Sequence, residues 1–140
     1  KTWQAGQALP LLVFLHGSNY ASRPYVETIA QSEFGERCFV VGIDGEAWLD
    51  GSEPGDPRQN YTYVNFMGKS TYEGYPHTDR ESPALVAELL ADLQQQLGST
   101  RTFVGGHSQG GFLTWFLAMH YPELVHGVFP MASGMVMQCE

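Results

Sequence analysis

The chain has 140 residues, of which 43% are hydrophobic and 16% charged, a composition typical of a soluble globular protein with one core. Seven Lys and Arg residues stand against fifteen Asp and Glu, and the formal net charge of −8 argues against nucleic acid and anionic lipid surfaces as partners. No apolar run reaches the roughly 18 residues of a membrane span. The chain does not open on the basic and then apolar segments of a signal peptide, and the sequence leaves open whether one has already been removed. We expect a single soluble domain over residues 1–140, in a compartment that the sequence leaves open.

The two cysteines, Cys38 and Cys139, are too few for a disulfide framework, and their spacing is not that of metal ligands. Cys38 is expected to be a small buried hydrophobic residue. No metal and no organic cofactor are indicated.

The first part of the chain predicts a strand, a helix and a second strand. Residues 11–15 form a continuous apolar run, typical of a parallel strand covered on both faces, and residues 16–19 follow as a turn. Apolar residues at helical spacing predict a helix over residues 24–34, ended by Gly35. Residues 38–43 predict a second buried strand, which completes a βαβ unit with a right-handed crossover.

Residues 45–81 change in composition to Gly, Pro, Asp, Asn and aromatic residues, with no clear periodicity. Such a segment is too long for a plain connection, and its aromatic residues argue against disorder. We expect an irregular, partly ordered loop over the strand ends. Its aromatic side chains are equally consistent with lining a pocket and with packing the loop onto the body.

The second part of the chain begins with a helix whose N-cap is expected at Ser82, with Pro83 at the first helical position and Gly98 as the stop. One apolar face of this helix is expected to pack in the core: Leu85, Val86, Leu89, Leu90, Leu93 and Leu97.

A strand over residues 102–106, a helix over about residues 109–121 and a strand over residues 127–132 follow. Alternating strands and helices predict an α/β fold, a mainly parallel sheet with helices on both faces.

The segment Gly106-His107-Ser108-Gln109-Gly110 joins the third long strand to the next helix. Gly-x-Ser-x-Gly is the pattern of a nucleophile elbow, in which glycines leave room for a strained serine. Because a chain of this composition contains the pattern by chance about 0.1 times, the strand and helix around it carry much of its significance.

A serine hydroxyl becomes a good nucleophile only when a histidine takes its proton, and a carboxylate usually orients that histidine. The developing oxyanion also needs hydrogen-bond donors. The backbone N–H of Gln109, at the start of a helix, is a candidate for one donor, and the turn after the first strand could supply the second.

Three segments, namely residues 11–17, residues 106–111 and residues 121–125 leading to Ser133-Gly134, resemble the α/β-hydrolase superfamily. Within it, the chain is most similar to the carboxylesterase, acyl-thioesterase and polyester-depolymerase-like esterases. The resemblance runs from residue 11 to residue 134 and is poor over residues 45–81. It implies that Ser108 is the acylated nucleophile and that Gln109 and Ser18 provide the N–H groups of the oxyanion hole.

The chain departs from this family after the elbow. In these hydrolases the acid and then the histidine follow the serine, whereas the candidates after Ser108 are Glu123 and Glu140 as acids and His120 and His126 as bases. None of them lies beside a further strand that would present it to Ser108. The chain therefore resembles the amino-terminal part of a hydrolase, truncated before the last strands. We expect a second polypeptide segment to carry the Asp and the His, and the sequence leaves open whether that part was separated by cleavage, omitted or never present.

The remaining ionisable candidates have simpler interpretations. His107 is expected to be a packing residue, because neighbouring side chains at an elbow point in different directions. We expect His16 to hydrogen-bond the oxyanion turn, His77 to be a solvated loop residue, and Asp44 to stabilise a turn.

The sequence thus predicts a serine hydrolase that cleaves small carboxylic esters or thioesters through an acyl-enzyme on Ser108. The alternative is a catalytically silent α/β-hydrolase-like domain used for binding or assembly, and an acyltransferase is a third reading. The acyl and leaving groups do not follow from the sequence.

Overall fold

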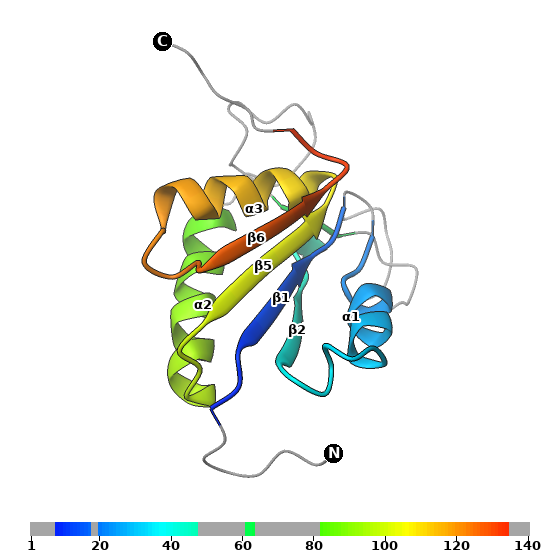
Figure 1. Ribbon diagram of the computed structural model, residues 1–140. Helices are drawn as coiled ribbons and strands as arrows, with labels where there is room; N and C mark the ends of the chain where they lie inside the picture. Colours follow the sequence, from blue (N-terminus) through cyan, green and yellow to red (C-terminus); the bar gives the residue numbers. More distant parts are fainter. Residues whose placement is uncertain (1–7, 18–19, 48–60, 64–81, 135–140) are drawn as a thin grey trace, which may run out of the picture.

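The fold is built on a parallel sheet of four strands (Figure 1). In the computed structural model, residues 8–17, 20–47, 61–63 and 82–134 are described. The strands are β1 (Leu11–Leu15), β2 (Phe39–Ile43), β5 (Thr102–His107) and β6 (Gly127–Met131), in the order β2-β1-β5-β6. Every neighbouring pair is parallel, which confirms the predicted α/β class.

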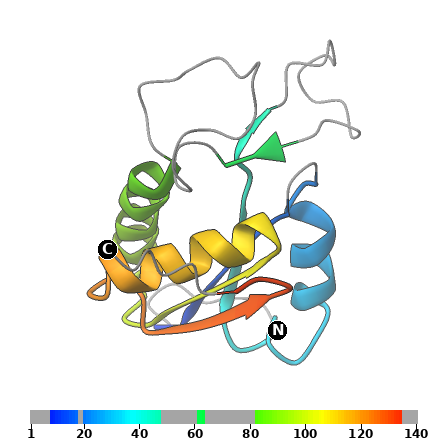
Figure 2. The ribbon, with the colours of Figure 1, turned by 90° about the horizontal axis from the view of Figure 1, so that it is seen from above.

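Helices cover both faces of this sheet. Helix α1 (Arg23–Ala30) lies on one face, where the rings of Tyr25 and Phe14 stack with centroids 4.6 Å apart. Helices α2 (Ser82–Leu97) and α3 (Gln109–His120) lie on the other, and Figure 2 shows α1 apart from these two. The core lies between these two helices and the sheet, and apolar side chains from both sides form it. The strands contribute Leu11, Val13, Leu15 and Val104, and the helices contribute Leu90, Leu113 and Leu117.

Two short strands, β3 (Glu46–Ala47) and β4 (Tyr61–Thr62), form an antiparallel pair outside the main sheet (Figure 2). They fall within residues 45–81, for which the sequence predicts an irregular loop. Residues 48–60 and 64–81 of that loop lie outside the described residues. Tyr63, which follows β4, is 3% exposed and belongs to the core, so this part of the loop is ordered against the body.

Helix α1 is shorter than the predicted helix over residues 24–34, because it ends at Ala30. The chain then turns back on itself, and a Cβ atom on Gly35 would lie 2.0 Å from the Ala30 carbonyl oxygen. Phe34, at the end of the predicted helix, lies beyond α1 and is 66% exposed. Cys38 is half-buried rather than buried, and its Sγ donates a hydrogen bond to the Phe34 carbonyl.

Helix α2 begins at Ser82, so this serine is the first helical residue rather than the N-cap. Its core-facing stripe is narrower than predicted. Val86 and Leu90 are buried, whereas Leu85 and Leu89 are 36% and 40% exposed. Leu85 and Leu89 directly precede the buried residues Val86 and Leu90, and one residue corresponds to about 100° around the helix axis. Both leucines therefore lie at the edge of the buried stripe.

In the described part of the chain, no helix is both long and apolar enough to cross a membrane.

The different burial of two adjacent leucines in α2 can be tested by substitution. We expect Leu90→Ala to lower the free energy of unfolding by about 2–5 kcal/mol, because it opens a cavity at a fully buried site. Leu89→Ala should change it by less than about 1 kcal/mol, because that side chain is 40% exposed. Urea unfolding of both variants measures the difference, and equal losses would contradict the placement of α2.

Candidate active site at the carboxyl ends of the strands

Ser108 occupies the corner between β5 and α3 with φ 51° and ψ −114°. A residue with a side chain rarely adopts positive φ, and such a conformation costs on the order of 1–3 kcal/mol. Backbone hydrogen bonds hold the corner on both sides. The Ser108 N–H donates to the Met131 carbonyl (2.9 Å), and the Ser108 carbonyl accepts from the Phe112 N–H (3.0 Å).

The two glycines that flank this serine allow close backbone approaches. A Cβ atom on Gly106 would lie 2.3 Å from the Gly110 carbonyl oxygen. A Cβ atom on Gly110 would lie 2.3 Å from the Leu15 carbonyl oxygen and 2.4 Å from that of His16. Both approaches exclude any larger residue without a backbone shift, so the Gly-x-Ser-x-Gly spacing corresponds to a physical requirement here.

The turn after β1 lies against the same corner. A Cβ atom on Gly17 would lie 3.1 Å from Nδ1 of His107 and 3.4 Å from Cβ of Ser108. The structure therefore brings the start of the predicted oxyanion turn next to the candidate nucleophile. Ser18 follows Gly17 but lies outside the described residues, so its role as an oxyanion donor stays a prediction.

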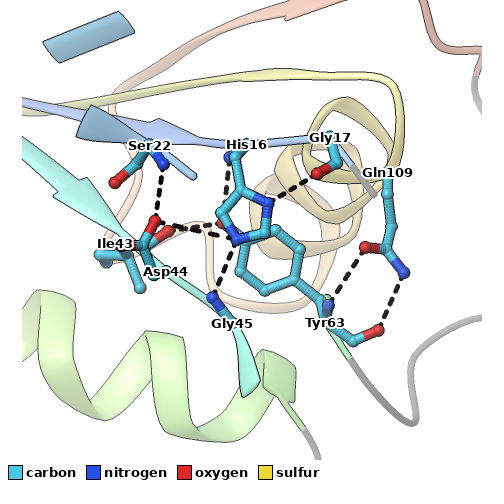
Figure 3. A network of polar contacts seen from close by, with 8 residues as sticks. All are labelled: His16, Gly17, Ser22, Ile43, Asp44, Gly45, Tyr63 and Gln109. Carbon is cyan, nitrogen blue, oxygen red and sulfur yellow. Dashed lines mark hydrogen bonds and ion pairs between the residues drawn. The ribbon is translucent and has the colours of Figure 1, made fainter. Parts of the chain in front are cut away.

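Gln109 is the first residue of α3, and its side chain makes a contact that the sequence did not suggest. Its carboxamide pairs with both backbone groups of Tyr63 (Figure 3). Oε1 accepts from the Tyr63 N–H (3.1 Å), and Nε2 donates to the Tyr63 carbonyl (2.9 Å). The backbone N–H of Gln109 belongs to the amino end of a helix, where the dipole favours negative charge. Its role as an oxyanion donor also stays a prediction.

His16 is fully buried, and contacts at both ring nitrogens define its tautomer (Figure 3). Nε2 accepts the N–H of Gly45 (2.9 Å), so the proton is on Nδ1, which donates to the Gly17 carbonyl (2.7 Å). This arrangement agrees with the expectation that His16 hydrogen-bonds the oxyanion turn. Because both nitrogens are engaged, His16 is not placed to act as a catalytic base.

Burial lowers the pKa of His16 below its usual value of 6.5. The hydrogen bond to the Gly17 carbonyl and the charge of Asp44 oppose this shift and are the smaller effects. The Asp44 carboxylate lies 3.9 Å from Nε2 of His16 and accepts the N–H of Ser22 at 2.6 Å. Asp44 therefore ties the end of β2 to the start of α1, as expected of a turn-stabilising carboxylate.

Tyr63 is the residue of this site that sequence reasoning missed, because it was one of several aromatic residues in an irregular segment. Its ring stacks on His16 with centroids 4.5 Å apart. Its hydroxyl donates to the Ile43 carbonyl (2.6 Å) and accepts the backbone N–H of His16 (3.0 Å). Burial raises the pKa of Tyr63 well above the usual tyrosine range, so the phenol stays protonated and acts as donor and acceptor together.

His107 packs as predicted, with its ring 6.2 Å from that of Tyr25 in a stacked arrangement. Its Nδ1 is buried without a hydrogen-bond partner in the described structure.

The other described histidines lie elsewhere. His126 accepts the Thr102 N–H (3.2 Å) at the amino end of β5, and His120 stacks on Phe116 near the end of α3. His77 lies outside the described residues. No histidine in the described ranges hydrogen-bonds Ser108, and none of those ranges brings three His, Cys, Asp or Glu residues together as metal ligands.

The backbone strain at Ser108 predicts a stability difference between two variants that both remove the hydroxyl. Ser108→Gly should be more stable than Ser108→Ala by about 1 kcal/mol, because glycine adopts positive φ without a Cβ clash and alanine does not. Urea unfolding of the two purified variants gives this difference. An alanine variant as stable as the glycine variant would show that the corner carries little strain.

Burial of neutral His16 predicts a loss of stability in acid. Because its pKa is lowered in the folded state, the unfolded chain takes up a proton first as the pH falls through 6.5. The free energy of unfolding should therefore fall between about pH 7.5 and pH 5.5, by more in the wild type than in His16→Gln. Urea unfolding at both pH values measures this slope.

Thr114→Val is the matched control for this dependence of the unfolding free energy on pH. It removes a buried hydrogen bond to the Gly110 carbonyl that contains no titrating group. It should lower the free energy of unfolding equally at both pH values, so that the difference between the two pH values stays as in the wild type. If the unfolding free energy of His16→Gln falls with pH as much as that of the wild type, His16 is not the source of the acid sensitivity.

Comparison with known proteins identifies the family to which this fold belongs. The family model for the alpha/beta hydrolase fold matches residues 10–139. Among solved structures, the chain is similar to a thermostable esterase, with a TM-score of 0.59 at 20% sequence identity. The match covers 97% of this chain and 36% of that esterase, so the chain spans about a third of the esterase's length. With a family match over nearly its whole length, this chain belongs to the α/β-hydrolase fold family.

Proposed function

We propose that the protein is a serine hydrolase that cleaves carboxylic esters or thioesters, with Ser108 as its nucleophile. The observation that carries the proposal is the positive φ of Ser108 at the corner between β5 and α3, with glycines at the close approaches. Family membership and the esterase neighbour support the reaction class. A strained serine at the carboxyl end of a parallel strand is typical of a nucleophile elbow.

In this mechanism the Ser108 hydroxyl attacks the substrate carbonyl while a histidine takes its proton. The tetrahedral intermediate collapses, the alcohol or thiol leaves with that proton, and the acyl group stays on Ser108. Water then attacks the acyl-enzyme and releases the carboxylic acid. The N–H groups of Gln109 and Ser18 are proposed to stabilise the oxyanion in both steps.

We further propose that the histidine and its carboxylate come from polypeptide outside this chain. The described histidines are held in other contacts, since His16 bridges Gly17 and Gly45, and His126 bonds Thr102. His107 packs against Tyr25. A second segment that supplies an Asp and a His would complete the site, and a small ester or thioester suits a protein of net charge −8.

Covalent labelling with a fluorophosphonate tests the assignment of Ser108, because only an activated serine reacts quickly with this probe. We expect the native protein to be labelled and Ser108→Ala to show no labelling. Ser99→Ala is the control, since its hydroxyl bonds the Arg101 carbonyl at the opposite end of β5, and its labelling should match the wild type. Mass spectrometry of the labelled peptide locates the adduct.

Labelling that survives Ser108→Ala would reject Ser108 as the nucleophile. No labelling of the complete native protein would favour a catalytically silent domain used for binding or assembly. Rapid labelling of the isolated 15.5 kDa chain would contradict an external histidine.

A further inference from the structure

We infer that the side chains of Gln109 and Tyr63 are positioning groups, which hold the start of α3, with its proposed oxyanion donor at Gln109, in a fixed relation to the turn at His16 and Gly17. The inference rests on the proposed function of Ser108. Its basis is one continuous path of buried contacts that joins the start of α3 to the turn after β1 (Figure 3).

The path begins at the carboxamide of Gln109. This group forms two hydrogen bonds with one residue, accepting from the N–H of Tyr63 and donating to its carbonyl. Both residues are buried, with exposed fractions of 9% and 3%. Two bonds to one backbone unit fix its orientation as well as its distance. The residue after the proposed nucleophile thus holds a segment 46 positions away in the sequence.

The path continues through the phenol of Tyr63 to the ends of two strands. Leu15 and Ile43 are the last paired residues of the ladder between β1 and β2. Just beyond this pair, the hydroxyl accepts the His16 N–H and donates to the Ile43 carbonyl. The phenol therefore bridges the two strands where direct backbone pairing stops, and it sets the direction in which the chain leaves β1.

The path ends at the turn that precedes Ser18. The ring of His16 stacks on Tyr63, and its Nδ1 donates to the Gly17 carbonyl. Gly17 in turn lies against Ser108. Gln109 and the turn at His16 and Gly17 are about 90 residues apart in the chain, yet both are attached to Tyr63. A shift of one donor by about 1 Å can lower a rate by roughly 10²-fold, so this shared attachment bears directly on catalysis.

A positioning role differs from a purely structural one in its kinetic effect. The oxyanion exists only in the intermediate and the transition states that flank it, so misplaced donors lower kcat and leave KM nearly unchanged. A variant that is merely destabilised contains less folded enzyme. Replacement of any comparable side chain would lower the activity in the same way.

The kinetic test compares Tyr63→Phe and Gln109→Met with Tyr25→Phe, using hydrolysis of p-nitrophenyl butyrate by the native protein. Tyr63→Phe keeps the ring stack and removes only the hydroxyl. We expect kcat to fall about tenfold to a hundredfold in the first two variants, with KM within about threefold. Tyr25→Phe removes a hydroxyl on the other face of the sheet and keeps the ring that stacks on Phe14 and His107, so it should change neither constant by more than about twofold.

An unchanged kcat in Tyr63→Phe, a rise in KM alone, or an equal loss in Tyr25→Phe would overturn the inference. Active-site titration corrects kcat for the folded fraction in each variant.

Backbone amide spectra test the same path without any activity. In ¹H–¹⁵N spectra of the native protein, Tyr63→Phe should shift the signals of Gly17 and Gln109, and Tyr25→Phe should leave both in place. If the signals of Gly17 and Gln109 do not shift in Tyr63→Phe, the inference is overturned even if kcat falls. If the wild type does not hydrolyse the ester and is not labelled at Ser108, the proposed function fails. These spectra alone then decide whether Tyr63 links Gln109 to the turn at Gly17.

Discussion

The close approach of the start of α3 to the end of β1 is the constraint on which this site depends. Gly110 lies so near the Leu15 and His16 carbonyls that a single Cβ atom would not fit. The ladder between β1 and β5 ends at the pair Leu15 and Gly106, so the corner at Ser108 falls at the same level as the turn after β1. A helix that begins this close to the sheet leaves the connecting residue no relaxed conformation. The positive φ of Ser108 is the result, with its N–H bonded to Met131.

Buried polar groups surround this corner, and backbone atoms satisfy most of them. A buried polar group without a partner costs about 1–3 kcal/mol, so a site rich in His, Gln and Tyr would be unstable if their side chains faced only apolar neighbours. Here His16, Tyr63 and Gln109 bond backbone groups that the ends of strands would otherwise leave unpaired. The same bonds that satisfy the side chains therefore define the paths of the turns.

The parallel topology explains why residues so far apart in the sequence meet here. The carboxyl ends of β1, β2, β5 and β6 all lie along one edge of the sheet, which is where α/β folds bind ligands. Asp44 extends the arrangement to the other face by accepting the Ser22 N–H at the start of α1. Both helical layers are thus attached to the edge that carries Ser108.

The sequence by itself determined the features that depend on neighbouring residues. Apolar runs and helical spacing identified the parallel α/β fold, and the strand, Gly-x-Ser-x-Gly and helix order located the corner at Ser108. Only the tertiary structure decided that α1 ends at Ala30, that Leu85 and Leu89 lie at the edge of the core stripe, and that Gln109 holds Tyr63. The reason is physical: local patterns report which residues prefer a helix, a strand or the interior. The partner of a buried carboxamide or phenol is instead set by how distant segments pack, and Tyr63 carries no local signal that distinguishes it from the other aromatic residues of its segment.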